Sequence, residues 1–291
     1  MKILLALDAS QASEHILQEV AKRPWPDGST CELLTVVPPA LPYVMGPVAE
    51  AVEGAARKQV GRAAERLRSR QLNAKGLVRC GDPKRVILEQ ADAGHADLIM
   101  VGAHGGGALE RFLLGSVSRP VLRHATCSVE IVRRPVRPDA HEYKVLLAVD
   151  GSDGAARAAD AVAERPWPSG TEVRVLSALE LHLNFFRAAF EIPALDPSHL
   201  QPQKEEAMRH AQKAIRAALE ILERSGVTVT ESLSVRLEPP KQIILEEAEE
   251  WGADLIILGS HGLRGVNRFL MGSTSEAVAT HAKCSVEVVR A

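Results

Sequence analysis

The stretch ADLIMVGAHGGGALERFLLGS, residues 96–116, decides the fold because the chain contains it twice. The second copy, ADLIILGSHGLRGVNRFLMGS, occupies residues 253–273. Each copy joins a continuous apolar run to a glycine-rich segment that ends in Gly-Ser. A continuous apolar run is typical of a strand that is buried on both faces of a parallel sheet. Glycine lets the following turn bend sharply or approach another group closely. We therefore expect the same strand–turn–helix unit in two places of an α/β fold.

The repeat extends outward from this stretch in both directions. KILLALDAS at residues 2–10 returns as KVLLAVDGS at 144–152, a shift of 142, and CSVEIV at 127–132 returns as CSVEVV at 284–289, a shift of 157. The second copy thus carries 157 − 142 = 15 extra residues, which lie between Pro168 and Val235. A unit of this length is a duplicated domain and not a solenoid repeat. We expect domain 1 at residues 1–135, a linker at 136–143 and domain 2 at 144–291.

Within each copy, strand and helix patterns alternate. In the first copy the expected strands are residues 3–7, 31–37, 77–80, 97–101 and 128–132. The expected helices run from Ser10 to about Lys22, from Val48 to Arg70, onward from Asp82-Pro83, and from Ser116 or Ser118 to about His124. Pro120 falls in the first turn of the last helix, so either its cap lies at Ser118 or one backbone hydrogen bond is lost. Parallel neighbouring strands need helical crossovers, so five strands separated by helices predict a doubly wound parallel sheet.

Composition limits the classes of partner. The 291 residues are 46% hydrophobic and 25% charged, as in ordinary globular proteins, and the net charge is −2. A dedicated nucleic-acid binder needs a basic face, which this chain lacks. No apolar run approaches the ~20 residues that span a bilayer. The four cysteines show no C-x-x-C pair, which favours reduced thiols. We expect a cytoplasmic protein without a nucleic-acid or membrane partner.

The glycine spacing carries a resemblance. Gly102 and Gly105 are followed by nine residues and then Gly115-Ser116, and the second copy repeats this spacing from Gly259. With an aspartate ending the first strand of each copy, the chain resembles the universal stress protein family in its tandem two-domain form. ATP-binding members of that family carry G-x-x-G, nine residues, then G-S or G-T. The resemblance implies strand order 3-2-1-4-5 in each domain, ATP as ligand with or without Mg²⁺, and a regulatory role in stress responses.

The chemistry of the motif agrees with an anionic ligand. Unpaired N–H groups and the positive dipole end at a helix start favour phosphate, and nearby hydroxyls add donors. By resemblance, the aspartates contact the nucleoside, and the backbone at the end of the second strand meets adenine. The predicted ATP-binding residues are Asp8, Val36, Gly102, Gly105, Gly115, Ser116, Val117 and Ser118 in the first copy, and Asp150, Ala178, Gly259, Gly262, Gly272, Ser273, Thr274 and Ser275 in the second.

Structural alternatives stand beside each of these roles. A glycine-rich turn can be purely structural, and an aspartate after a strand can be a helix cap or turn former. For His104 and His261 we favour hydrogen bonds to the loop over metal binding, because no second ligand lies at a suitable spacing. We therefore predict no metal site. Arg111 and Arg268 have two open interpretations, a phosphate contact or a solvated side chain.

Three functions remain open from the sequence. The first is an ATP-binding regulatory protein whose nucleotide state sets its conformation or its partners. The second is a slow ATP hydrolase, but no Walker lysine pattern is present and the only acid in the phosphate loops is Glu110, so we predict no catalytic residue. The third is a nucleotide-free scaffold whose duplication mimics a homodimer.

The fifth strands, SVEIV and SVEVV, are candidate sheet edges, and edges invite pairing. We expect them to lie side by side about a pseudo-twofold axis, giving an intramolecular pseudo-dimer, while a homodimer of two chains stays open. The extra residues contain Phe185, Phe186 and Phe190. These rings form either a lid or partner surface near residues 184–195, or they pack on their own domain, which we favour.

Overall fold

In the computed structural model, the chain forms two similar α/β halves. The structure describes residues 1–39, 47–104, 114–133, 142–180, 201–223, 225–236, 238–263 and 271–290. The first half contains β1 (Lys2–Leu7), α1 (Gln11–Lys22), β2 (Thr30–Val37), α2 (Pro47–Arg68), β3 (Asn73–Cys80), α3 (Pro83–Gly94), β4 (Leu98–Gly102), α4 (Ser118–His124) and β5 (Ser128–Val132). The second half contains β6 (Lys144–Ala148), α5 (Asp153–Glu164), β7 (Glu172–Glu180), α7 (Gln201–Leu222), β8 (Thr228–Arg236), α8 (Pro240–Trp251), β9 (Leu255–Gly259), α9 (Ser273–His281) and β10 (Ser285–Val289).

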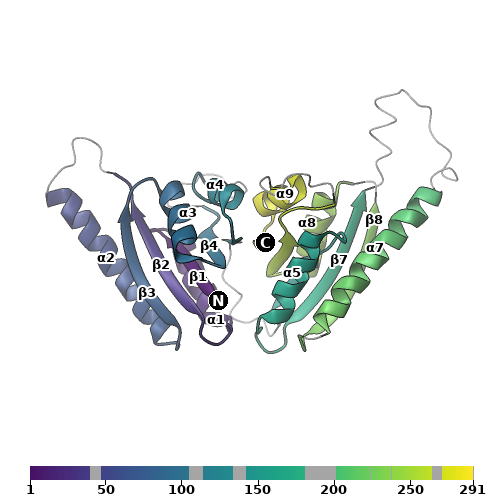
Figure 1. The fold of residues 1–291 in the computed structure, drawn as a ribbon, viewed down its shortest axis with the longest axis horizontal. Helices are drawn as coiled ribbons and strands as arrows, with labels where there is room; N and C mark the ends of the chain where they lie inside the picture. The colour runs from purple at the N-terminus through teal and green to yellow at the C-terminus, as the bar shows by residue number, and fades with distance from the viewer. Residues whose placement is uncertain are drawn as a thin grey trace, which may run out of the picture.

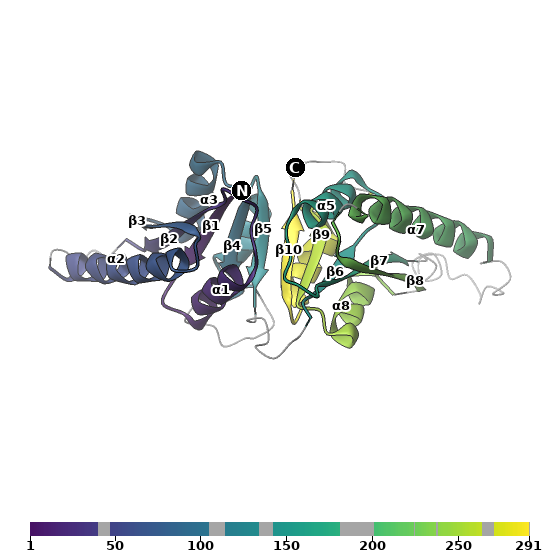
Figure 2. The same cartoon turned by 90° about the horizontal axis from the view of Figure 1, so that it is seen from below.

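All strands join one sheet that runs through both halves. Its order is β3-β2-β1-β4-β5-β10-β9-β6-β7-β8 (Figures 1 and 2). Pairing inside each half is parallel, and β5 pairs with β10 antiparallel. The predicted doubly wound sheet with order 3-2-1-4-5 is therefore confirmed, as is the expected adjacency of the fifth strands. In this register Glu130 lies opposite Glu287, its counterpart in the repeat.

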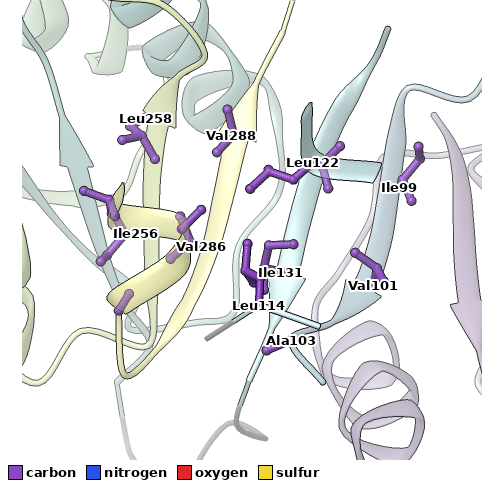
Figure 3. Packing of buried hydrophobic residues seen from close by; sticks show 14 of the residues in the cluster. Ile99, Val101, Ala103, Leu114, Leu122, Ile131, Ile256, Leu258, Val286 and Val288 are labelled. Carbon is purple, nitrogen blue, oxygen red and sulfur yellow. The ribbon is translucent and has the colours of Figure 1, made fainter. Parts of the chain in front are cut away.

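Apolar side chains on the two faces of the sheet form separate cores. On one face of the first half, Leu5 and Leu33 pack with Ile16 of α1 and Leu67 of α2. On the other face, α3, α4, α8 and α9 cover a single apolar cluster that continues from one half into the other. Ile131 and Val286 belong to it (Figure 3). The two halves thus share a core through the β5–β10 pair.

Three local details differ from the expectations. β3 begins at Asn73, not at residue 77, because this edge strand starts with polar residues that give no apolar run. Ser10 is the N-cap residue of α1, but its side chain makes no capping hydrogen bond. α4 begins at Ser118 with Val117 as N-cap. Pro120 is the third residue of α4, where a backbone N–H has no acceptor within the helix, so the proline costs this helix no hydrogen bond.

Several predictions fall outside the described residues. These are Gly105, Glu110, Arg111, Arg268, most of the linker at 136–143, and the phenylalanine-rich segment near 184–195. Within the described ranges, no helix has both the length and the apolar character required to cross a membrane.

Candidate functional site

The turns that follow β1 and β4 meet at the carboxyl edge of the sheet. Ala6 of β1 pairs with Val101 of β4, so Asp8 and Gly102 follow neighbouring strands. In the second half Ala148 pairs with Leu258, which brings the turns containing Asp150 and Gly259 together in the same way. Ligands of open α/β sheets bind at such a carboxyl edge, where the strand order reverses. The sequence motif and the fold therefore indicate the same place in each half.

Asp8 is held by the start of α1. Its Oδ1 atom accepts hydrogen bonds from the backbone N–H of Ser10 at 2.9 Å and the Ser13 hydroxyl at 2.8 Å, and also from the Ser10 hydroxyl. The Asp8 N–H donates to Ser13 Oγ at 2.7 Å, and Gln59 Nε2 donates to the Asp8 carbonyl at 3.1 Å. Among the described residues, these hydrogen bonds to the carboxylate all reach Oδ1, and Asp8 is an exposed residue.

Asp150 is held differently, by the glycine-rich turn of its own half. Its Oδ1 accepts from the Ser152 N–H at 3.0 Å, and its Oδ2 accepts from the Leu263 N–H at 3.1 Å. A Cβ atom at Gly262 would lie 2.6 Å from the same Oδ2. Glycine at this position therefore allows the turn to approach the carboxylate. Both oxygens of Asp150 thus accept hydrogen bonds, and the first-half counterpart of Leu263, Gly106, lies outside the described residues.

The first glycine of each motif has a structural reason of its own. A Cβ atom at Gly102 would lie 2.5 Å from Cβ of Ala12, in the first turn of α1. A Cβ atom at Gly259 would collide with the backbone of Gly154, which takes the place of Ala12 in the second half. The end of the fourth strand thus packs directly against a helix. These two glycines are required by packing whether or not a ligand binds.

The Gly-Ser segments contain both engaged and exposed groups. The Gly115 and Gly272 amides donate to the Ala103 and Ser260 carbonyls, each at 2.8 Å. The hydroxyls of Ser118 and Ser275 donate to the Gly102 and Gly259 carbonyls at 2.6 and 2.7 Å. These bonds tie the helix start to the end of the strand. By contrast, Ser116 and Ser273 are exposed, and Val117 and Thr274 are half-buried.

A cavity of about 600 Å³ opens beside Asp8, between α1 and α2. Ser13, Thr35 and Gln59 line it, and Lys58 adds a cationic group. Of the predicted site residues, Asp8 is the one that reaches it. Val36 is half-buried one residue before the end of β2, and Ala178 is buried within β7, two residues before its end. The structure thus places hollow space next to the predicted nucleoside end.

Two histidines lie inside the motif with one ring nitrogen unpaired. In the described part of the chain, Nε2 of His104 and Nε2 of His261 are buried without a hydrogen-bond partner. Nδ1 of His261 lies 2.9 Å from the Ser260 hydroxyl oxygen. The described residues contain no group of three metal-binding side chains. An unpaired buried nitrogen is costly, so each ring suits a polar partner in the adjoining turn.

Sequence reasoning missed the groups that orient the aspartates. Ser13 follows Asp8 by five residues, and this short spacing could have identified it. Gln59 and His210, which contact the Asp8 and Asp150 carbonyls at 3.1 Å, come from long helices far along the chain. Only the fold brings them to the site.

These features define a class of protein: two doubly wound α/β halves in tandem, each with an aspartate facing a glycine-rich turn at the carboxyl edge of the sheet. The family model of the universal stress protein family matches residues 1–133 and 143–290. The chain belongs to the universal stress protein family.

Known proteins agree with this assignment. A universal stress protein of Mycobacterium tuberculosis is 29% identical over 223 residues, which are 76% of this chain and 70% of that protein. The crystal structure of a universal stress protein from Archaeoglobus fulgidus has a TM-score of 0.66 at 22% identity, covering 99% of this chain and 96% of that one, and so shows the same fold. Another universal stress protein was solved in complex with cAMP; it covers 51% of this chain and 97% of its own, with 26% identity and a TM-score of 0.36.

Proposed function

We propose that each half binds ATP, with or without Mg²⁺, at the carboxyl edge of its sheet, and that the bound nucleotide sets the conformation or the partners of a cytoplasmic stress-response protein. The observation that carries this proposal is the recurrence of one glycine spacing, each time directly after the fourth strand and beside an aspartate. A purely structural turn needs the first glycine, as the packing shows, but it does not need exposed serines at the start of the following helix.

The proposed contacts follow from the geometry of the turns. The triphosphate lies along the segments 102–105 and 115–118 in the first half and 259–262 and 272–275 in the second. Amides in the first turn of a helix have no acceptor within the helix, so they suit a phosphate at the start of α9. The exposed hydroxyls of Ser116 and Ser273 and the half-buried Thr274 add donors. The hydroxyls of Ser118 and Ser275 shape the turn instead, because they already bond to carbonyl groups.

The two halves differ at the nucleoside end of the proposed site. In the first half Ser13 holds Asp8 Oδ1, and a cavity lies beside Asp8. In the second half Ala155 stands in place of Ser13, and the Leu263 N–H binds Asp150 Oδ2. We therefore expect the first half to bind nucleotide more tightly.

The nucleotide-free scaffold is the alternative that a specific observation favours. Gly102, Gly259, Ser118 and Ser275 all have structural roles that need no ligand. This alternative predicts that the purified protein contains no nucleotide and binds none.

The test begins with freshly purified protein, which is denatured so that released nucleotide can be identified and counted by chromatography. Glycine-to-valine variants would disturb packing, so we choose Ser116→Glu and Ser273→Glu, singly and together, with Ser→Gln at the same positions as controls. A carboxylate at a helix N-terminus does not destabilise the helix, but it repels phosphate. We expect each glutamate variant to lose nucleotide from its own half. Unchanged nucleotide content in the double glutamate variant would contradict the proposed site.

A further inference from the structure

The strands that join the two halves bury an unbalanced group of charges. Glu130 in β5 and Glu287 in β10 lie opposite each other, and each is 0% exposed. Arg165 binds Glu287 through two hydrogen bonds of 2.6 and 2.7 Å. Arg23 binds Glu130 through a single one, from Nη2 to Oε2 at 2.5 Å. The repeat thus places one arginine beside each glutamate, but the two pairs are not alike.

A third carboxylate makes the difference. Glu19 of α1, 1% exposed, lies 3.2 Å from Arg23 Nε and shares this guanidinium with Glu130. The Tyr143 hydroxyl donates to Glu19 at 2.6 Å. In the second half the position of Glu19 is taken by Ala161. Three buried carboxylates therefore face two guanidinium groups, and the surplus negative charge lies on the side of the first half.

One carboxylate oxygen of this group, Oε1 of Glu130, is left without a partner among the described residues. In the described part of the chain, Glu130 Oε1 is buried and has no hydrogen-bond partner. The groups that face Glu130 are Arg23 and Glu19 from α1, Glu287 from β10 with its partner Arg165, and Tyr143 before β6. Its neighbour in β4 is the apolar Met100, and α4 covers the opposite face of the sheet. Among the described residues of these elements, Arg23 and Arg165 are thus the positive charges near Glu130, and Arg165 is already paired with Glu287.

An uncompensated buried carboxylate is strongly unfavourable, and a protein removes the charge most simply by binding a proton. We propose that the interface between the two halves binds one proton, on Oε1 of Glu130, and that loss of this proton at rising pH weakens the β5–β10 contact. Burial raises the pKa of Glu130 to about 7; Arg23 lowers it in part, and Glu19 and Glu287 raise it further. The transition lies near neutral pH, where a change in intracellular acidity would act on it.

The direction of the pH dependence follows from linkage. A glutamate in the unfolded chain loses its proton near its ordinary pKa of 4.5, whereas folded Glu130 keeps it to about pH 7. The stabilisation from this proton is therefore complete below pH 4.5 and is lost as the pH rises to about 7, with no further loss above. This inference does not depend on nucleotide binding.

The test uses the full chain and the variant Glu130→Gln, which imitates the protonated side chain. Other groups, including ten histidines, titrate in the same range, so the unfolding constant of the wild type is divided by that of the variant at each pH. We expect this ratio to rise about tenfold per pH unit between about pH 5 and pH 7 and then to level off. A ratio that does not change with pH would overturn the proposal.

Two further variants test whether the surplus of buried carboxylates is what keeps Glu130 protonated. Glu287→Gln makes the same change at the equivalent position, but it breaks the paired bonds to Arg165, so we expect destabilisation at every pH. If Glu130→Gln destabilises the chain to the same extent, Glu130 is ionised and the proposal is wrong. Glu19→Gln keeps an acceptor for Tyr143 but leaves two carboxylates for two arginines. We expect the rise of the unfolding-constant ratio to end at a lower pH in this variant, because the pKa of Glu130 falls when Glu19 loses its charge. An unchanged end point would refute the charge-balance argument.

Hydrogen exchange tests whether loss of the proton weakens the β5–β10 contact itself. Hydrogen exchange of the β5 and β10 amides reports opening of the contact between the halves. After correction for the intrinsic pH dependence of exchange, we expect protection of these amides to fall between about pH 5 and pH 7 in the wild type and to stay constant in Glu130→Gln. Equal protection across this range in the wild type would mean that the proton does not act on the contact.

Discussion

Arg133 and Arg290, which are equivalent in the repeat, each hold a helix end of the opposite half. The Nη2 atom of Arg133 donates to the last carbonyls of α9, and that of Arg290 donates to the last carbonyls of α4. The bonds are to Ala279 at 2.6 Å and Thr280 at 3.0 Å, and to Leu122 at 2.6 Å and Arg123 at 3.3 Å. The last carbonyls of a helix have no partner within it, so each half completes a helix of the other. These helices begin at the proposed nucleotide sites, so the contact joins the two sites through the interface.

Replacing either arginine should weaken the contact between the halves. We expect Arg133→Met and Arg290→Met each to lower the free energy of unfolding by about 1–3 kcal/mol, because helix-end carbonyls lose a charged donor. Burial lowers the pKa of Arg133 to about 10, which agrees with its neutral carbonyl partners. Urea titration measures the effect, and Arg79→Met, at an exposed position of β3, is the control. If the free energy of unfolding falls no more than in this control, the hydrogen bonds from Arg133 and Arg290 to the helix ends do not stabilise the protein.

The close contact of Gly102 with α1 predicts an effect that a second substitution corrects. Gly102→Ala places a methyl group 2.5 Å from Cβ of Ala12, and we expect it to lower the free energy of unfolding by about 1–3 kcal/mol. Adding Ala12→Gly removes the opposing methyl group and should restore part of this loss, less about 1 kcal/mol for glycine in a helix. Gly259→Ala meets the backbone of Gly154, so no such partner substitution exists there. If the double variant Gly102→Ala, Ala12→Gly loses as much free energy of unfolding as the two single variants together, residues 102 and 12 are not in close contact.

The cysteines should differ widely in reactivity. Burial raises the pKa of Cys31 and of Cys127 to about 11, so at pH 8 only about one in a thousand of these thiols is the reactive thiolate. Cys80 is exposed at the end of edge strand β3. We expect iodoacetamide to modify Cys80 first in the folded protein, and Cys31 and Cys127 only slowly, as followed by mass spectrometry of peptides. Urea should remove the difference. Labelling of Cys31 as fast as Cys80 without urea would show that the core around β2 opens readily.

Much of the fold could be predicted because its central strands are continuous apolar runs. β1 and β4 stand out for this reason, and their repetition predicts the second half. The start of β3 could not be predicted, because an edge strand tolerates polar residues such as Asn73 and Lys75. The burial of Glu130 in the middle of SVEIV could not be predicted either, because Arg23, which binds it, comes from the end of α1.

For the candidate site, the sequence located the turns, but it did not show which of their hydroxyl groups already make hydrogen bonds within the protein. Glycine spacing placed Gly102 and Gly115 near Asp8, and the strand order confirmed that these turns are neighbours. Whether a serine hydroxyl is available depends on its orientation, which no pattern encodes. Ser118 bonds to the Gly102 carbonyl, whereas Ser116 is exposed, although both lie in the same motif.

Ser13 offers the sharpest test of the difference between the two proposed sites. Its hydroxyl accepts from the Asp8 N–H at 2.7 Å and donates to Asp8 Oδ1 at 2.8 Å, and it is itself buried. The second half has Ala155 at this position, so Asp150 has no equivalent hydroxyl to hold it. We infer that Ser13 keeps the Asp8 carboxylate turned so that Oδ2 can receive a ribose hydroxyl.

We therefore expect Ser13→Ala to reduce the ATP affinity of the first half by about tenfold, which corresponds to about 1.4 kcal/mol, the size of one lost hydrogen bond to a charged group. Calorimetric titration measures it, with the Ser273→Glu background used to silence the second half. Ala155→Ser is the reciprocal variant, and it should strengthen binding in the second half because a hydroxyl there can hold Asp150 Oδ1 as Ser13 holds Asp8 Oδ1. Urea titration of both variants separates binding from folding. If Ser13→Ala lowers stability but leaves the ATP affinity unchanged, Asp8 is a turn former and not a ligand of the nucleoside.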